Sequence, residues 1–404
     1  MTLAVRLLGV LAAAVSVAVA APAAAASQTP LATRLDRALN TSGVSRSASG
    51  AIALNPSNGR VAYARNPDKP FQPASNQKLP VTLAALHKLG PDFRIPTRVY
   101  GEGSQDGHVW RGRLVLKGFG DPTLSRADLR ALALKVRNLG ITHVTGGVRG
   151  DETYFDDRRT APGWKPSFYK VWCPPLSALI VDRGKVNGST VDRPALAAAH
   201  AFRAALVRNG VAVMRSARVG PLGEGAVEFA RVRSPRVAAL VRAMNRPSDN
   251  FYAEMLVKKL GAYFRDKGST GAGATVVRRV LAARGVPLAG IRIADGSGLS
   301  LLDRLTTRAI SRMLVSARKD PAISGPFYDS LPIAGVNGTL KDRMRRGPAR
   351  GVVRAKTGTT LNASALSGYV GSRWVFSILQ NGSPVPWTSS RASQDRFAQI
   401  LAGG

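Results

Sequence analysis

The sequence predicts an α+β protein in which an antiparallel sheet flanked by helices is interrupted by an inserted, strand-rich accessory segment. Its 404 residues exceed what one core of ordinary size accommodates, and this length indicates roughly two or three domains. Three short runs in the last third, at 352–356, 363–370 and 374–379, alternate polar and apolar residues as antiparallel strands do. The middle section, 98–234, combines further strand patterns with two helical ones.

The N-terminal 26 residues differ in composition from the rest of the chain. Arg6 is followed by an apolar run over 7–21, interrupted only by Ser16, and by a small-residue tract that ends in an A-x-A pattern before Ser27. This pattern predicts a secretory signal peptide at 1–26. An uncleaved membrane anchor is the alternative, which the shortness of the run disfavours. We therefore expect an exported protein, acting in the cell wall, the periplasm or the extracellular space.

Net charge restricts the partners that this chain attracts. Lys and Arg number 58 against 24 Asp and Glu, which gives a formal charge of +34. Such a surface attracts polyanions. No zinc finger, RNA motif or long basic block accompanies the charge, so we expect no nucleic acid and favour anionic cell-wall polymers. The competing interpretation is that the arginines mainly solvate the surface.

Cysteine and histidine usage excludes two kinds of site. Cys173 is the only cysteine, so no intramolecular disulfide holds the exported chain together. The four histidines lack the spacing of a zinc site and make a Ser-His-Asp triad improbable. We expect no metal and no organic cofactor. His87 falls within an apolar run, and we interpret it as a core histidine.

The remaining elements follow from periodicity and turn signals, taken in chain order. Residues 30–40 predict a helix, and 50–54 with 60–65 predict a hairpin closed by the turn at 55–59. The apolar run 79–89 predicts a buried helix that begins near Ser75. Further strands are expected at 98–101, 109–116, 144–150, 211–219 and 227–232, and further helices at 126–139, 194–208, 238–244, from 248 onward, and at 272–284, 306–318 and 391–401.

The most informative local pattern is the S-x-x-K motif formed by Ser75 and Lys78. On a helix, residues i and i+3 share a face, so the lysine amine lies beside the serine hydroxyl. A buried lysine near a helix N-terminus loses its proton readily and can then act as the base that activates serine. The simpler interpretation is that Ser75 caps a core helix and Lys78 extends to solvent, because chance supplies roughly one such motif in a protein of this size.

Two further motifs favour the chemical interpretation. An S-D-N motif at 248–250 supplies a second hydroxyl and an amide, and a K-T-G motif at 356–358, followed by Thr359, lies on an expected strand. Average composition produces K-T-G by chance only on the order of once in several thousand residues. Its occurrence after the other two motifs, in this order, indicates one site.

With these motifs the chain resembles the penicillin-recognising serine acyl enzymes, whose signatures are S-x-x-K, S-x-N or S-D-N, and K-T-G. It is most similar to the type-4 penicillin-binding proteins, the D-alanyl-D-alanine carboxypeptidase and endopeptidase family, over nearly the whole mature chain. The surrounding segments that carry the resemblance are G-D-P-T-L at 120–124, S-D-N-F-Y-A-E at 248–254, D-G-S-G-L-S at 295–300, A-G-V-N-G-T-L at 334–340, A-K-T-G-T at 355–359 and S-A-L-S-G-Y at 364–369.

This resemblance implies a β-lactamase/transpeptidase-like domain built from 27–97 and 235–404, with one or more accessory domains at 98–234. The interval between Ser75 and Ser248 is far longer than a simple β-lactamase needs, and an inserted domain fills it. Pro80 departs from the expected pattern, because proline is tolerated only in the first turn of a helix.

The resemblance also implies a mechanism on peptidoglycan stem peptides, with acylation by β-lactam antibiotics. Ser75 attacks the D-Ala-D-X carbonyl, Lys78 takes its proton, and Ser248 passes a proton to the leaving amine. Backbone N–H groups of Ser75 and Thr359 form the oxyanion hole. The implied substrate-binding residues are Asn250, Lys356, Thr357, Gly358 and Thr359, with the peptide aligned along the 356–359 strand.

Two other functions remain open on the sequence alone. A class A-like β-lactamase needs a glutamate that activates the deacylating water, in an E-x-x-L-N type loop, and the chain has no such sequence. A non-catalytic, basic wall-binding protein of the same fold is the other possibility, which the three intact motifs disfavour.

Overall fold

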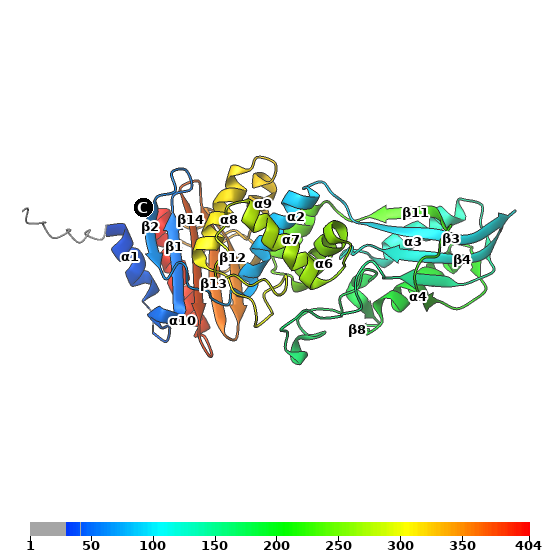
Figure 1. The fold of residues 1–404 in the computed structure, drawn as a ribbon, viewed down its shortest axis with the longest axis horizontal. Coiled ribbons are helices and arrows are strands. Elements are labelled where there is room, and N and C mark those ends of the chain that lie inside the picture. Colours follow the sequence, from blue (N-terminus) through cyan, green and yellow to red (C-terminus); the bar gives the residue numbers. More distant parts are fainter. Residues whose placement is uncertain (1–29, 41) are drawn as a thin grey trace, which may run out of the picture.

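The computed structural model describes residues 30–40 and 42–404. The expected signal peptide at 1–26 lies outside the described residues. The molecule is elongated, with one sheet near one end, a group of helices in the middle and a second sheet at the other end (Figure 1). Among the described residues, no helix is long and apolar enough to cross a membrane.

The first sheet joins the two ends of the described chain. Its five antiparallel strands lie in the order β12 (Val353–Thr360), β13 (Ala363–Val370), β14 (Trp374–Asn381), β1 (Ser49–Leu54) and β2 (Val61–Arg65). The predicted hairpin and the three predicted C-terminal strands are confirmed, although β12 and β14 extend beyond the expected ends. Every residue of β1 and β13 is buried, because helices cover both faces of the sheet.

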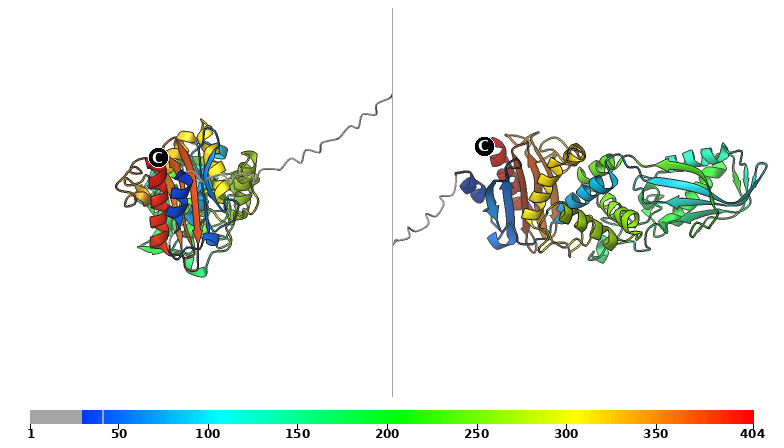
Figure 2. Two further views of the ribbon diagram at one scale, coloured as in Figure 1. Left: turned by 90° about the vertical axis from the view of Figure 1, so that its left-hand side faces the viewer. Right: turned by 45° about the horizontal axis from the view of Figure 1, so that its top comes forward.

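Two helices, α1 (Pro30–Leu39) and α10 (Trp387–Gly403), lie side by side on the outer face of this sheet (Figure 2, left). The opposite face meets a larger core that includes Leu83, Leu314 and Leu379. This core belongs to the central helices α2 (Lys78–Leu89), α5 (Val237–Asn245), α6 (Asn250–Arg265), α7 (Thr270–Ala283), α8 (Thr307–Lys319) and α9 (Ser324–Ser330).

The second sheet is formed within residues 96–233 and has its own core. Helices α3 (Arg126–Arg137) and α4 (Pro194–Arg208) pack on it. Its strands lie in the order β10 (Arg218–Val219), β6 (Val148–Asp151), β4 (Val109–Gly118), β3 (Pro96–Asp106) and β11 (Val227–Arg233), while β5 (His143–Val144) pairs with β4 and β9 (Ala212–Val213). A separate hairpin, β7 (Lys185–Val186) and β8 (Ser189–Thr190), lies below α4 in Figure 1.

Several local expectations were wrong. The strand expected at 98–101 is longer, because β3 continues to Asp106 and pairs with β4 over this length. Helix α9 was not foreseen. His87 is exposed at the end of α2, where its ring is 2.8 Å from an Arg284 nitrogen, so it is not a core histidine.

The expected helix start near Ser75 was also wrong by one turn. Residues Ala74–Gln77 form a 3₁₀ helix that contains Ser75, and α2 begins at Lys78. Pro80 is therefore the third residue of α2, where its missing N–H would have no partner within the helix. Proline at this position is therefore compatible with a helix that begins at Lys78.

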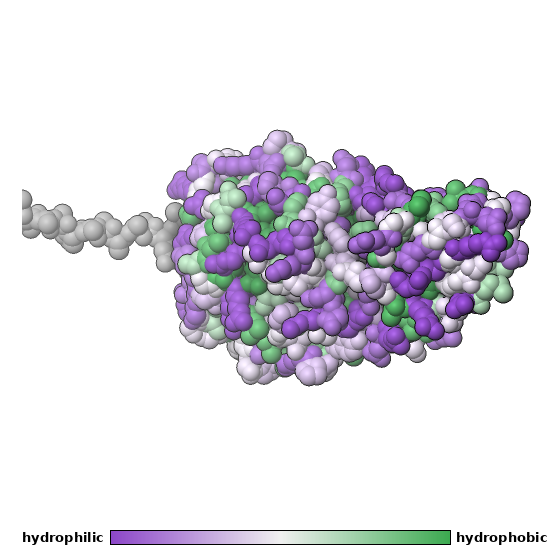
Figure 3. Space-filling model, turned by 45° about the vertical axis from the view of Figure 1, so that its right-hand side comes forward, coloured by the Kyte–Doolittle hydropathy of each residue, from purple (hydrophilic) through white to green (hydrophobic). Residues whose placement is uncertain are grey.

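The face of the molecule shown in Figure 3 is mainly hydrophilic, with small hydrophobic areas scattered among the polar side chains. This distribution agrees with the large surplus of basic residues in the sequence.

Candidate active site

Ser75 and Lys78 meet where the 3₁₀ helix Ala74–Gln77 joins α2. Lys78 Nζ is 2.9 Å from Ser75 Oγ. Lys78 is fully buried, whereas Ser75 is partly exposed. Ser75 is thus partly open to solvent, while the lysine beside it is not. The simpler interpretation, with Lys78 extended to solvent, is wrong.

Lys78 Nζ has two more acceptors and no ion-pair partner among the described residues. It donates to Asn250 Oδ1 at 2.8 Å and to the carbonyl of Ser297 at 2.7 Å. Burial lowers the pKa of Lys78 to about 8, and the carboxylates of Asp295 and Glu254 oppose part of this shift. An appreciable fraction of the amine is therefore neutral near pH 7, as a general base requires.

Ser248 and Lys356 form a second hydroxyl–amine pair in the same region. Lys356 Nζ donates to Ser248 Oγ at 2.8 Å and to the carbonyl of Thr357 at 3.0 Å. Burial, and secondarily the charge of Lys78, holds the pKa of Lys356 well below its ordinary value. Ser248 has a left-handed backbone with φ of 64°, a conformation that costs a non-glycine residue about 1–2 kcal/mol. Such strain is often found at functional sites.

Asn250 is held from both ends of its side-chain amide. Its Oδ1 accepts from Lys78, and its Nδ2 donates to the carbonyl of Trp172 at 3.0 Å. Trp172 belongs to the long segment between β6 and β7, and its own side chain is 60% exposed. Nδ2 carries two N–H groups, so one remains for a substrate carbonyl.

The K-T-G segment lies on β12, directly beside the turn that carries Ser75. A Cβ at Gly358 would lie 2.9 Å from the carbonyl oxygen of Pro73, so only glycine allows this approach. Asn76 Nδ2 fixes the same contact by donating to the carbonyl of Lys356 at 3.1 Å. Thr357 Oγ1 donates to Thr339 Oγ1 at 2.7 Å. Thr359 is exposed on the edge strand and accepts from Arg391 at 3.3 Å.

The fold thus brings together all the residues expected at the site, in two bonded groups on neighbouring elements. The first contains Ser75, Lys78 and Asn250, and the second contains Ser248 and Lys356 with the rest of K-T-G. The bond from Asn76 to the Lys356 carbonyl and the close approach of Gly358 to Pro73 hold the two groups next to each other.

A buried carboxylate next to Lys78 was missed by the sequence reasoning. Glu254 Oε1 accepts from the backbone N–H groups of Gly296, at 3.0 Å, and Ser297, at 2.8 Å. Burial, with a smaller contribution from Asp295, raises the pKa of Glu254 to about 8. Glu254 thereby holds the loop whose Ser297 carbonyl accepts from Lys78. The motif at 295–300 had been noted, but nothing local indicated this contact.

Within the described part of the chain, no group of three or more His, Cys, Asp or Glu side chains is arranged to hold a metal ion.

At the edge of a helix-flanked antiparallel sheet, a serine and a buried lysine are joined by a hydrogen bond. This arrangement defines a serine peptidase of the penicillin-recognising class. Residues 31–192 and 185–403 match the model of the D-Ala-D-Ala carboxypeptidase 3 (S13) family. The chain is 31% identical to the D-alanyl-D-alanine carboxypeptidase of Actinomadura sp. (strain R39), over 95% of this chain and 86% of that protein.

Two solved structures share the fold. Penicillin binding protein 4 (dacB) from Haemophilus influenzae superposes with a TM-score of 0.79 at 21% identity, covering 92% of this chain and 98% of that one. It has also been solved with a β-lactam bound. A predatory peptidoglycan endopeptidase from Bdellovibrio bacteriovorus gives a TM-score of 0.60 at 18% identity, covering 88% and 92%. At these identities the two structures establish the fold alone.

The chain belongs to the D-Ala-D-Ala carboxypeptidase 3 (S13) family. It is a serine-type D-Ala-D-Ala peptidase, and the predicted α+β fold with an additional sheet is confirmed.

Proposed function

We propose that the protein hydrolyses D-Ala-D-X bonds of peptidoglycan stem peptides through an acyl-enzyme on Ser75. The observation that carries this proposal is the 2.9 Å contact between Ser75 Oγ and the amine of Lys78, which is fully buried and has a pKa of about 8. Neutral Lys78 takes the hydroxyl proton as Oγ bonds to the substrate carbonyl carbon. This removes the need for a histidine base, and none of the site contacts described above involves one.

Ser248 is suited to deliver a proton to the leaving amine. Its Oγ is 2.8 Å from Lys356 Nζ, so a proton given to the departing nitrogen is replaced through this amine. Breakage of the C–N bond then leaves the acyl group on Ser75. Water later attacks the ester, and its hydroxyl remains on the acyl product. Lys78 returns its proton to Ser75 Oγ as the C–O bond breaks, and the proton released by the water replaces the one that left through Lys356.

Lys356 and Thr357 are the proposed anchor for the terminal carboxylate of the substrate. Lys356 is fully buried and has no carboxylate partner among the described residues, so its charged form is costly in the free enzyme. An arriving carboxylate provides the missing opposite charge. Gly358 and Thr359 continue along an edge strand, to which a peptide can add as a further strand.

The oxyanion hole in this proposal consists of the backbone N–H groups of Ser75 and Thr359. They belong to two segments that the Gly358 contact with Pro73 holds together. Asn250 would bind the amide on the acyl side, because Nδ2 has a second N–H beside the one that it donates to the Trp172 carbonyl.

We further propose that residues 98–234 form the accessory domain, and 27–97 with 235–404 the peptidase domain. The separate cores of the two sheets support this division. Export to the wall, the periplasm or the medium fits a substrate found outside the cytoplasm, and the basic composition suits anionic wall polymers. β-Lactams would acylate Ser75, because they imitate the D-Ala-D-Ala bond.

Labelled penicillin tests the nucleophile directly. The protein should form a covalent adduct that mass analysis locates on Ser75, and Ser75→Ala should abolish labelling. Ser57→Ala, in an exposed turn, is the matched control and should label normally. An adduct on another residue, or an active protein that never labels, would refute the assignment. Mass analysis of digested muropeptides then separates carboxypeptidase from endopeptidase products.

A further inference from the structure

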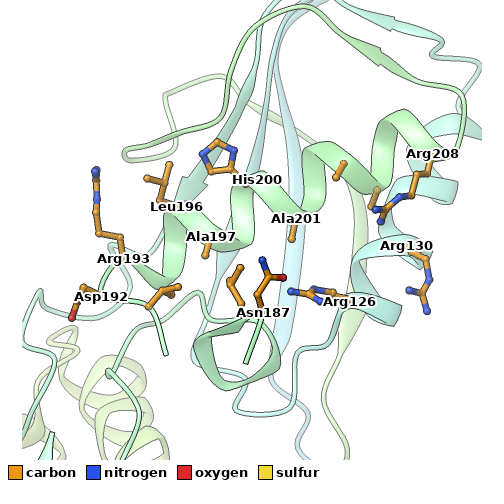
Figure 4. Close-up of a pocket in the computed structure, with 14 residues that line it drawn as sticks. Arg126, Arg130, Asn187, Asp192, Arg193, Leu196, Ala197, His200, Ala201 and Arg208 are labelled. Atoms are coloured by element: carbon orange, nitrogen blue, oxygen red, sulfur yellow. The ribbon is translucent and has the colours of Figure 1, made fainter. Parts of the chain in front are cut away.

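The accessory region contains a cavity of about 740 Å³ that includes none of the proposed catalytic or substrate-binding residues. It lies between α4, the beginning of α3 and the β7–β8 hairpin, and Figure 4 shows its lining. Its volume lies within the range of small-ligand sites, about 300–1,000 Å³.

Four arginines give the cavity a strongly basic lining. Figure 4 shows Arg193 at one end of the cavity and Arg126, Arg130 and Arg208 at the other. Arg126 lies 3.4 Å from the carboxylate of Asp182. The guanidinium groups of the other three have no ion pair or side-chain hydrogen bond within residues 30–40 and 42–404.

The single acidic side chain of the lining does not neutralise these arginines. Asp192 Oδ1 accepts from Lys170 Nζ at 2.7 Å and from the Tyr169 hydroxyl at 3.1 Å. It is therefore already paired outside the cavity. Three unpaired guanidinium groups around one cavity complement a ligand that carries carboxylates, which arginine binds with two parallel hydrogen bonds.

The floor between the arginines is apolar and made of small side chains. Helix α4 contributes Leu196, Ala197, Ala201 and Ala204, and the neighbouring hairpin contributes Val186. Short side chains leave room for methyl groups of a ligand, whose burial adds to the electrostatic attraction. A polyphosphate would use the arginines but not this floor.

The cavity is connected to the catalytic site by one chain segment. Asp192 at the cavity binds Tyr169 and Lys170, and two residues further on the carbonyl of Trp172 accepts from Asn250 Nδ2. The segment 169–172 therefore contacts both Asp192 at the cavity and Asn250 at the catalytic site.

We propose that this cavity binds a second stem peptide of the peptidoglycan substrate, that is, a short alanine-rich peptide with free carboxylates. This inference rests on the proposed function. The methyl groups lie on the α4 floor, and the carboxylates pair with Arg130, Arg193 and Arg208. The second site retains polymeric substrate while the catalytic site acts on a neighbouring stem.

The test uses the full protein with Ser75 blocked by penicillin, titrated by calorimetry with a stem tetrapeptide that already lacks its terminal D-Ala. One tetrapeptide should still bind per protein. The triple variant Arg130→Gln, Arg193→Gln, Arg208→Gln should weaken binding about tenfold or more, because each lost charge-assisted contact is a substantial part of a weak affinity. Ala197→Phe, which fills the cavity without changing charge, should weaken it as well.

The matched control removes three arginines elsewhere. Arg34, Arg37 and Arg279 are exposed, and their guanidinium groups have no ion pair or side-chain hydrogen bond in the described chain. Their triple change to Gln has the same effect on net charge. This control should bind tetrapeptide normally. Both triple variants should turn over a small soluble D-Ala-D-Ala peptide at the rate of the unmodified protein.

Each contrary outcome has one meaning. Absence of tetrapeptide binding to the blocked protein overturns the second site, and so does equal loss in the control triple variant. Binding of polyphosphate in place of the peptide would identify a general polyanion site and also overturns the proposal. Failure of penicillin to modify Ser75 refutes the proposed nucleophile instead, while the tetrapeptide titration of the variants still decides the cavity.

Discussion

Replacing Lys78 with arginine separates base catalysis from simple positive charge. Lys78 is fully buried, and its Nζ contacts Ser75 Oγ, Asn250 Oδ1 and the Ser297 carbonyl. Arginine keeps the charge and can donate to the same acceptors. Its guanidinium stays protonated in proteins, so it cannot accept the serine proton.

The expected magnitude follows from the pKa of Lys78, which is about 8. Near pH 7 about one tenth of the amine is neutral, and near pH 6 about one hundredth, since each unit below the pKa reduces this fraction about tenfold. Acylation of the unmodified enzyme should therefore rise about tenfold per unit up to pH 8 and then level. At pH 8 the acylation rate of Lys78→Arg should be at least about 10²-fold lower than that of the unmodified enzyme, which is the lower end for loss of a general base. Its acylation rate should also no longer rise with pH.

The assay is stopped-flow acylation by a fluorescent penicillin between pH 5.5 and 9.5, with folding of each variant checked by thermal unfolding. Lys88→Arg is the matched control, because Lys88 is exposed near the end of the same helix. It should retain both the rate and the pH profile. Lys78→Met, which is uncharged and of similar length, should be as slow as Lys78→Arg, and it replaces that variant if the larger guanidinium prevents folding.

Two results would refute this reasoning. If folded Lys78→Arg acylates within a few-fold of the unmodified protein, Lys78 is not the base. If acylation by the unmodified protein is constant from pH 6 to pH 9, a group with a different pKa activates Ser75.

Three other perturbations give further expectations. Gly298→Ala should reduce the acylation rate at least tenfold, because Gly298 has φ of 85° and an added Cβ would lie 1.9 Å from the carbonyl oxygen of Ala74, beside Ser75. Penicillin labelling measures this rate, and an unchanged rate would show that the turn tolerates displacement. Lys356→Met should raise KM for a peptide with a free terminal carboxylate by about 10-fold or more, yet change KM much less for the corresponding C-terminal amide; equal effects on both would remove the carboxylate from the role of Lys356. Binding to insoluble wall material should fall steeply as salt rises toward 0.1 M, where screening acts over about 10 Å, while turnover of a small peptide changes little; salt-independent wall binding would show that the arginine surplus plays no part in attachment.

How far the sequence predicted the fold depended on whether the relevant contacts were local. The hairpin of β1 and β2 was predicted because turn residues and alternation act over a few positions. The contact between Ser75 and Lys78 was predicted for the same reason, since three residues of helical chain bring them together. The start of α2 was misplaced, because the single turn of 3₁₀ helix before Lys78 leaves no clear signal in composition.

The tertiary structure decided the properties that depend on burial and on distant partners. Nothing near Lys78 in the sequence indicates that Asn250 and the Ser297 carbonyl accept from its amine. Its lowered pKa comes from removal of water by elements far apart in the chain, opposed by Asp295 and Glu254. A desolvation energy belongs to the packed molecule and to no single segment.

The sequence by itself therefore determined which hydroxyls, amines and amides are present and their order along the chain. It also identified the family, because the S-x-x-K, S-D-N and K-T-G motifs and the segments around them occur in the family's order along the chain. Only the tertiary structure paired Lys356 with Ser248 and Asn250 with Trp172, and only it formed the arginine-lined cavity beside α4. Each of these depends on chain segments that are distant in sequence and adjacent in space, and local patterns carry no record of such adjacency.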